Sequence, residues 1–330
     1  MKQLVTGANG HLGNNILRYL LSQNISAIAG VRNVNHLEPF AGLNAEIRQI
    51  DLLDRQSIEK ALEGVDVLYQ AAAVFKRWAK NPKKEIIDAN IEGTRNIIEI
   101  AAKKGVKKIV YISSLASVNR QINPFDGTTW NPTGKEEPYI YSKTEAEKLA
   151  HQLGHKYDLD ITFILPSLIL GPHFYTGTPS IDVFKSTFGK QLKYLPDFKF
   201  LMVDVRDVAK ACHNASIHGK SFERYVTSYE KTVSIADLFI HLQKHYPDKN
   251  YLTPKPITKG KLLFLASLSE IVSKITNKPP LMTRAVVLQY SEAKFEQVDI
   301  SKAKSDLTFT LTDIEQSIQD TYSFIESLKE

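Results

Sequence analysis

The chain has 330 residues and is 43% hydrophobic, a size at which one hydrophobic core usually stops growing, so we expect a large domain with a smaller one. Its net charge of +6 comes from interleaved acidic and basic residues, which argues against a nucleic-acid-binding surface. A single cysteine, Cys212, excludes an intramolecular disulfide and a thiolate metal cluster. The longest uninterrupted apolar run, Leu262 to Ala266, is too short to span a bilayer, and no hydrophobic leader precedes a cleavage site, so we expect a soluble cytoplasmic protein.

The first fourteen residues predict a strand, a tight turn and the start of a helix. The apolar pair Leu4-Val5 leads into Thr6-Gly7-Ala8-Asn9-Gly10-His11-Leu12-Gly13, after which apolar residues recur at helical spacing. A helix start presents unpaired N–H groups and the positive end of the helix dipole, which suit a pyrophosphate. In this spacing, Gly7 permits the turn, Gly10 permits a close approach of phosphate, and Gly13 permits tight packing of helix on strand. The pattern therefore predicts a dinucleotide site that includes Gly7, Asn9, Gly10, His11, Leu12 and Gly13.

Strand-like and helix-like segments then alternate, which predicts a parallel sheet covered by helices on both faces. We expect strands at residues 26–31, 45–50, 65–69 and 108–112, and a short helix at 57–62. A long helix should begin near Pro82 and end at Lys104. The run Ala71-Ala72-Ala73 follows the fourth strand, where small side chains allow a ligand to pass closely, although a tightly packed turn has the same composition.

The end of the second strand bears on the choice of cofactor. NAD enzymes usually place a carboxylate about 20 residues past the glycines to bind the ribose 2′-hydroxyl. This chain has no acidic residue between the glycines and Glu38, and Arg32 stands at that place. A guanidinium group suits a 2′-phosphate, so we expect NADP(H) to be preferred, with NAD(H) possible.

A second group of candidate residues combines a tyrosine, a lysine and serines. Pro138 fits the first position of a helix on which Tyr139 and Lys143, four apart, share a face. An ammonium group close to a phenol lowers the pKa of the phenol from about 10, so Tyr139 could exchange a proton near neutral pH. Upstream, Ser113 and Ser114 follow the fifth strand, where ligands bind in this architecture, although serine is also an ordinary turn residue.

Together with Asp51-Leu52 and with Asn90, Gly93 and Thr94, these motifs resemble the extended short-chain dehydrogenase/reductase family over nearly the whole chain. The resemblance implies an α/β fold, with a Rossmann-type doubly wound parallel sheet and a smaller mixed α/β C-terminal lobe for the substrate. We expect residues 1–165 to form the cofactor domain, with 198–228 returning to it, and residues 166–330 to form mainly the substrate lobe. The family also implies a monomer or homodimer.

The resemblance assigns roles in catalysis. Tyr139 would be the acid/base, and Lys143 would hold the nicotinamide ribose and tune the tyrosine. Ser114 would polarise the substrate oxygen, with Ser113 and Ser117 as alternatives.

It also assigns supporting and cofactor-binding roles. Asn90 would support a water that links the lysine to solvent, or would simply pack the helix. Asp51 and Leu52 would flank the adenine, and the nicotinamide would lie near Pro166 and Ser167.

Within the family, residues 164–172 look most like the dihydroflavonol reductase branch, which has a proline after the sixth strand and reduces ketones with NADPH. Nucleotide-sugar epimerases typically have arginine in place of Pro166 and an acidic residue near Arg32. We therefore predict an NADPH-dependent oxidoreductase that reduces a ketone or aldehyde of a small organic substrate. A nucleotide-sugar epimerase or dehydratase and a non-catalytic NADP-binding regulator remain alternatives.

The rest of the chain suits a lobe over the site. We expect strands at 199–203 and 223–227, a helix capped by Ser234, and a closing helix from Leu311 to Leu328. An amphipathic helix over 262–275 should face the core, as a lid or a dimer contact, rather than a membrane. Candidate pocket residues on loops near the strand ends are Phe75, Arg77, Trp78, Phe125, Trp130, His173 and Tyr175.

Two histidine pairs have the spacing of metal ligands on a helix. His151 and His155, like His241 and His245, are four residues apart. Neither pair has an obvious third ligand or a metalloprotease glutamate, so we predict no metal site.

Overall fold

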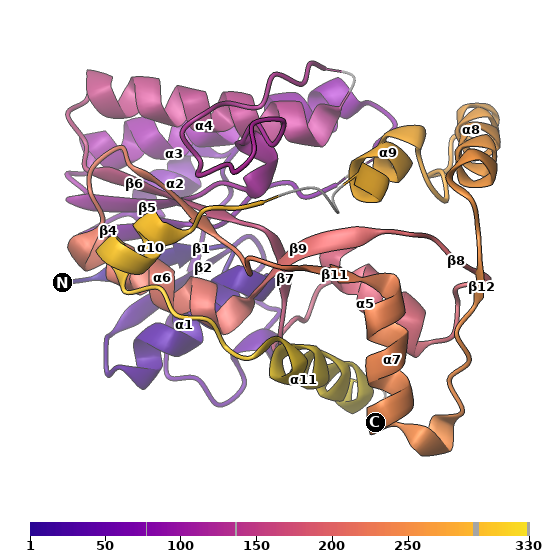
Figure 1. The fold of residues 1–330 in the computed structure, drawn as a ribbon. Helices are drawn as coiled ribbons and strands as arrows, with labels where there is room; N and C mark the ends of the chain where they lie inside the picture. Colours follow the sequence, from indigo (N-terminus) through magenta and orange to yellow (C-terminus); the bar gives the residue numbers. More distant parts are fainter. Residues whose placement is uncertain (77, 136, 293–296, 329–330) are drawn as a thin grey trace.

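The computed structural model describes residues 1–76, 78–135, 137–292 and 297–328. Its centre is a seven-stranded parallel sheet in the order β10-β6-β5-β4-β1-β2-β3 (Figure 1). The chain turns outward in both directions from β1, so the sheet is doubly wound and the predicted Rossmann-type α/β class is confirmed. The strands are β1 (Gln3–Thr6), β2 (Ala27–Val31), β3 (Glu46–Gln49), β4 (Val67–Gln70), β5 (Lys108–Ile112), β6 (Ile161–Pro166) and β10 (Arg224–Thr227).

Helices cover both faces of this sheet, because its strands are apolar on both sides (Figure 1). On one face, α1 (His11–Ser22) packs on α6 (Val205–His218). On the other face lie α2 (Arg55–Ala61), α3 (Ala89–Lys103) and α4 (Pro138–Lys156). The long helix expected between Pro82 and Lys104 is present, although its start, Lys83–Asp88, forms a π-helix.

The smaller lobe has its own core and its own sheets. The strands β7 (Leu168–Leu170), β9 (Lys199–Asp204) and β11 (Thr232–Ser234) form one sheet, and β8 (Tyr194–Leu195) pairs with β12 (Lys255–Pro256). Aromatic side chains such as Phe174, Phe184 and Tyr322 fill the core between these strands and the helices. The helices are α5 (Pro179–Phe188), α7 (Ile235–His245), α8 (Lys259–Thr276), α9 (Arg284–Glu292) and α11 (Ile314–Ser327).

Two later segments return to the first domain. Strand β10 pairs with β6, and α10 (Ser301–Leu307) packs on α6 and β10. Ile300, Ala303 and Leu307 are buried in the core of the large sheet. Of the residues 198–228 expected to return, β10 joins the large sheet, whereas β9 pairs within the sheet of the smaller lobe. The return of α10 was not expected, because α10 is too short to show a clear period.

Helix α8 differs from its prediction. We expected its apolar face to point to the core, but Phe264 and Ile275 are 69% and 77% exposed. Among the described residues, no helix is both long enough and apolar enough to cross a bilayer.

Candidate active site

The glycine loop between β1 and α1 forms a compact cradle. Gly7 has φ +64°, in the region that favours glycine. A Cβ on Gly13 would lie 2.2 Å from the carbonyl oxygen of Gly7, so only glycine lets α1 start this close to the turn. Gly10 is the N-cap of α1 and brings no side chain to its first N–H groups, and the first turn has no acidic residue. These N–H groups are therefore suited to an anion.

His11 and Asn15 connect the start of α1 to residues 171–172, which lie far along the chain. His11 Nε2 lies 3.1 Å from the carbonyl oxygens of Gly171 and Pro172, and Asn15 Nδ2 donates to Pro172 at 3.1 Å. Burial lowers the pKa of His11 to about 4, so its ring is neutral and Nε2 carries the hydrogen that these carbonyls accept. The side chain of His11 thus anchors the glycine loop. Only the backbone N–H of His11 is left to bind an anion.

The alanine run after β4 packs beside the glycines. Thr6 Oγ1 accepts hydrogen bonds from the N–H groups of Ala71 and Ala72, each at 3.0 Å. A Cβ on Gly7 would lie 3.0 Å from Ala72 Cα. Ala72 therefore lies against the glycine loop, while Ala71 and Ala73 line the neighbouring cavity.

The residues expected at the adenosine end lie at the tips of β2 and β3. Arg32 directly follows β2 and is exposed. Asn9, in the neighbouring glycine loop, is half-buried. Asp51 Oδ1 accepts from the N–H of Leu53 at 3.0 Å. A Cβ on Gly93 of α3 would lie 3.0 Å from Leu52 Cβ, so this glycine lets Leu52 pack closely on the helix.

The candidate catalytic residues Ser114, Tyr139 and Lys143 line one cavity of about 560 Å³ at the carboxyl ends of β4, β5 and β6, whereas Asn90 does not. Tyr139 and Lys143 lie one turn apart on α4, as their spacing predicts. The ring of Tyr139 packs on Phe75, with 4.9 Å between ring centroids. The lining also includes Leu12, Ala71, Ala73, Ser114, Pro166 and Ser167.

Lys143 is buried beneath the cavity, and its Nζ donates to the carbonyl oxygen of Ile112 at 3.2 Å. Burial lowers the pKa of Lys143 to about 8, and the nearby carboxylate of Glu147 partly opposes this shift. The lysine can therefore lose its charge in a pH range where an ordinary lysine keeps it.

The three candidate serines have different partners. Ser113 donates to Glu147, and Ser117 donates to the carbonyl oxygen of Ser114 at 2.8 Å. Ser114 Oγ accepts a hydrogen bond from the N–H of Ala116 at 3.1 Å, which uses an oxygen lone pair rather than the hydroxyl hydrogen. Ser113 and Ser114 both line the cavity, but the hydroxyl hydrogen of Ser113 is used by Glu147, so Ser114 stays the predicted contact for a substrate.

A buried ion pair behind these serines was missed by the sequence patterns. Arg224 Nε lies 2.7 Å from Glu147 Oε1, and Arg224 Nη2 donates to Ser117 Oγ at 3.0 Å. Arg224 also donates to the carbonyl oxygen of Gly127 and stacks 3.8 Å above the ring of Trp130. Glu147 is four residues after Lys143, a spacing visible in the sequence, but its partner on β10 is not.

Asn90 ties the loop after β4 to α4. Its Oδ1 accepts from the N–H of Val74 at 2.7 Å, and its Nδ2 donates to Val74 and to Ser142 Oγ at 3.1 and 3.0 Å. Both amide hydrogens are thus used within the protein. Asn90 and Lys143 also line a small cavity of about 10 Å³, about the size of one water molecule, so the arrangement is compatible with both roles predicted for Asn90.

Two of the candidate pocket residues, Phe75 and Trp78, line the cavity. The described lining does not include the other four placed residues, and Arg77 lies outside the described residues. Phe125 is buried in the core, Trp130 covers Arg224, His173 packs on Phe324 and Tyr175 accepts from Arg18. The sequence patterns missed a wall formed by Pro280, Met282, Val286 and Tyr290, far along the chain.

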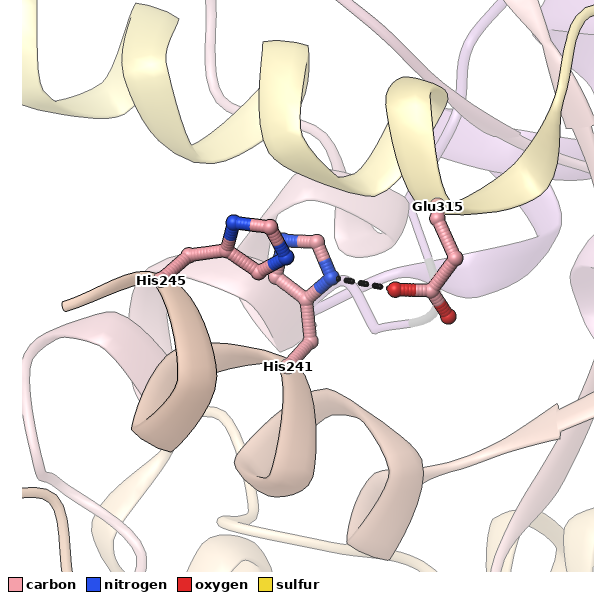
Figure 2. Close-up of side chains that lie close together, drawn as sticks. All are labelled: His241, His245 and Glu315. Carbon is pink, nitrogen blue, oxygen red and sulfur yellow. Dashed lines mark hydrogen bonds and ion pairs between the residues drawn. The ribbon is translucent and has the colours of Figure 1, made fainter. Parts of the chain in front are cut away.

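The pair His241 and His245 does have a third potential metal ligand nearby, whereas the sequence showed none. Figure 2 shows Glu315 of α11 reaching His241, with the ring of His245 lying over that of His241. His241 Nδ1 lies 2.8 Å from Glu315 and its Nε2 lies 3.0 Å from Gln319 Oε1. Both nitrogens are therefore engaged in joining α7 to α11. The rings of His151 and His155 instead stack on Phe163 and Phe222.

Comparison with known proteins supports the architecture. The model of the NAD dependent epimerase/dehydratase family matches residues 3–227. The chain is 34% identical over 235 residues to sterol demethylase protein B of Methylococcus capsulatus, covering 70% of each chain. It is 26% identical to a putative dihydroflavonol 4-reductase of Synechocystis, over 98% of this chain and 94% of that relative. The structure of yeast methylglyoxal/isovaleraldehyde reductase complexed with NADPH has a TM-score of 0.79 at 20% identity, covers 100% of this chain and 99% of its own, and thus shares the fold.

Proposed function

The chain belongs to the NAD-dependent epimerase/dehydratase family, and we propose that it is an NADPH-dependent oxidoreductase that reduces a ketone or aldehyde of a small organic substrate. This membership confirms the resemblance to the extended short-chain dehydrogenases/reductases, a family of enzymes. One observation carries the proposal. Ser114, Tyr139 and Lys143 converge on a single cavity beside the glycine loop.

The residues around the cavity fit a dinucleotide. The glycine cradle offers bare N–H groups, and Ser167 Oγ, at the end of β6, is buried without a hydrogen-bond partner among the described residues. A buried hydroxyl without a partner is costly, which suits a polar ligand group at this place. The glycine loop would hold the diphosphate, and Pro166 and Ser167 would contact the nicotinamide. When bound, the reduced nicotinamide supplies a hydride.

The side chains of the cavity supply the proton and the polar contacts. Tyr139 gives its phenolic proton to the carbonyl oxygen of the substrate. Ser114 donates a hydrogen bond to the same oxygen as negative charge develops there. Lys143, when charged, favours the phenolate form of Tyr139 and so lowers the cost of the proton transfer.

The preference for NADPH over NADH rests on Arg32. Its side chain is exposed directly after β2, and the acidic residue that would bind a 2′-hydroxyl is missing from the sequence up to Glu38. A guanidinium group can bind the 2′-phosphate with two parallel hydrogen bonds.

The lining of the cavity favours a reductase over a nucleotide-sugar epimerase. Phe75, Trp78, Phe198, Phe200 and Met282 contribute apolar surface. Such a wall suits an apolar or aromatic carbonyl compound better than a sugar, which has no comparable apolar surface to bury.

The test is the oxidation of NADPH by the purified protein with a panel of aromatic and aliphatic aldehydes and ketones. We expect turnover of at least one apolar member. Conversion of a nucleotide sugar without added cofactor would instead establish the epimerase alternative. Binding of NADPH without turnover of any substrate would establish the regulator.

A further inference from the structure

Helix α8 buries its less apolar side and exposes its more apolar side. Leu262, Ala266 and Ser273 are the buried residues of the helix. Its large apolar side chains on the other side are between 44% and 77% exposed, and we call them the docking face: Phe264, Leu265, Leu268, Ile271, Val272 and Ile275. At about 3.6 residues per turn, these six side chains occupy an arc of about 120°.

The position of α8 leaves this face at the edge of the molecule. Figure 1 shows α8 at the outer end of the smaller lobe, with α9 between it and the large domain. Several hydrogen bonds join α8 to the segment that follows it. Among them, Ser269 Oγ accepts from the N–H of Leu281 at 2.8 Å, and Glu270 Oε1 accepts from the N–H of Arg284 at 2.8 Å. Because Leu281 and its neighbours line the cavity, α8 is tied to one wall of the candidate active site.

The charge around the docking face is strongly positive. Residues 259–284 contain five basic residues and one acidic residue, a net charge of +4. Lys261 and Lys274 are exposed on α8 itself, and Lys261 lies within the arc of the docking face. Long lysine side chains can keep their ammonium groups in a polar layer while their methylene stems lie along apolar surface.

We propose that α8 docks the protein on an anionic lipid surface, with the docking face inserted below the headgroups and the lysines among them. An apolar helix face flanked by basic residues is the usual chemistry of such binding. Charge also decides against the main alternative occupant, because a second copy of this chain would bring two segments of net charge +4 together. The proposal does not depend on the reaction proposed above.

The experiment is flotation of the full chain with lipid vesicles. We expect binding to vesicles with about one third phosphatidylglycerol to exceed binding to pure phosphatidylcholine by about tenfold or more, and to weaken at high salt. The double variant Phe264→Ser/Ile271→Ser should reduce binding to the anionic vesicles by about tenfold or more, as should Lys261→Glu/Lys274→Glu.

A matched control is Ile217→Ser/Ile240→Ser, which changes two side chains that are each 60% exposed on α6 and α7. This control should bind like the wild type, and all variants should keep the wild-type thermal unfolding midpoint. The proposal fails if the wild type does not float with anionic vesicles, or if docking-face variants bind as well as the control. It also fails if light scattering shows a dimer that the docking-face variants dissociate while vesicle binding is absent, since the occupant is then a second copy.

Discussion

Arg224 and Glu147 form an ion pair behind the serines of the candidate active site, with 2.7 Å between Nε and Oε1 and side chains that are 6% and 0% exposed. The pair joins β10 to α4, and both partners also bond to the serine loop after β5. A buried pair of this kind is costly to break, because the remaining charge is left in an apolar interior.

Removing one partner of this pair should therefore destabilise the fold. We expect Glu147→Ala to lower the free energy of unfolding by about 3–5 kcal/mol, measured by urea denaturation. The matched control is Glu59→Ala, which breaks the exposed pair with Lys103 and should change stability much less. Equal effects of the two variants would show that burial of the Glu147 pair has no special cost.

Replacing the phenol of Tyr139 should remove the proton donor and leave the fold intact. We expect Tyr139→Phe to reduce kcat by about two to four orders of magnitude, with little change in the Kd of NADPH. Tyr141→Phe, two residues along the same helix, is the control and should keep its activity, because Tyr141 is not among the described lining residues of the cavity. Near-normal turnover by Tyr139→Phe would remove this tyrosine from the mechanism.

The three serines can be separated by measuring activity and stability together. Ser114→Ala should lower kcat by about tenfold to a hundredfold and lower stability only slightly, because Ser114 lines the cavity and its Oγ accepts one hydrogen bond, from the N–H of Ala116. Ser113→Ala should instead lower stability, because it leaves a buried carboxylate oxygen of Glu147 without its hydroxyl donor. The reverse result would assign Ser113 to the substrate.

The lowered pKa of Lys143, about 8, predicts a pH dependence with a definite sign. In the unfolded chain this lysine keeps a pKa near 10.5, so between about pH 8 and 10.5 the unfolded state binds more protons than the folded state. The contribution of Lys143 to the free energy of unfolding should thus rise with pH through this window. Over the same window kcat/KM should fall, because the charged ammonium that supports Tyr139 is lost. Between pH 7 and about 11, the unfolding free energy of the wild type should rise relative to that of Lys143→Met. A constant difference would contradict a lowered pKa.

Cofactor choice should depend on Arg32. We expect Arg32→Ala to weaken NADPH binding by about tenfold or more while the Kd of NADH stays nearly unchanged, because NADH has no 2′-phosphate. Arg95→Ala, an exposed arginine on α3, should affect neither cofactor. Tighter binding of NADH than of NADPH by the wild type would contradict the preference for NADPH.

The features that the sequence predicted well are local ones. The glycine loop, the strand positions of the first half and the shared helix face of Tyr139 and Lys143 depend on backbone freedom and on periods of two or 3.6 residues, which neighbouring residues determine. A capping residue was predicted in the same way, since Ser234 caps α7 as expected.

Contacts between distant residues required the tertiary structure. The bond between His11 and Gly171 spans 160 residues, and the pair of Arg224 with Glu147 spans 77. Only the tertiary structure shows that Glu147 on α4 engages the hydroxyl of Ser113 and that Arg224 on β10 engages that of Ser117. The outward face of α8 likewise had the same period as a core helix, because a hydrophobic pattern says that one face is apolar but not which neighbour, if any, covers it. By itself the sequence therefore determined which side chains could do chemistry, and packing decided which of them meet.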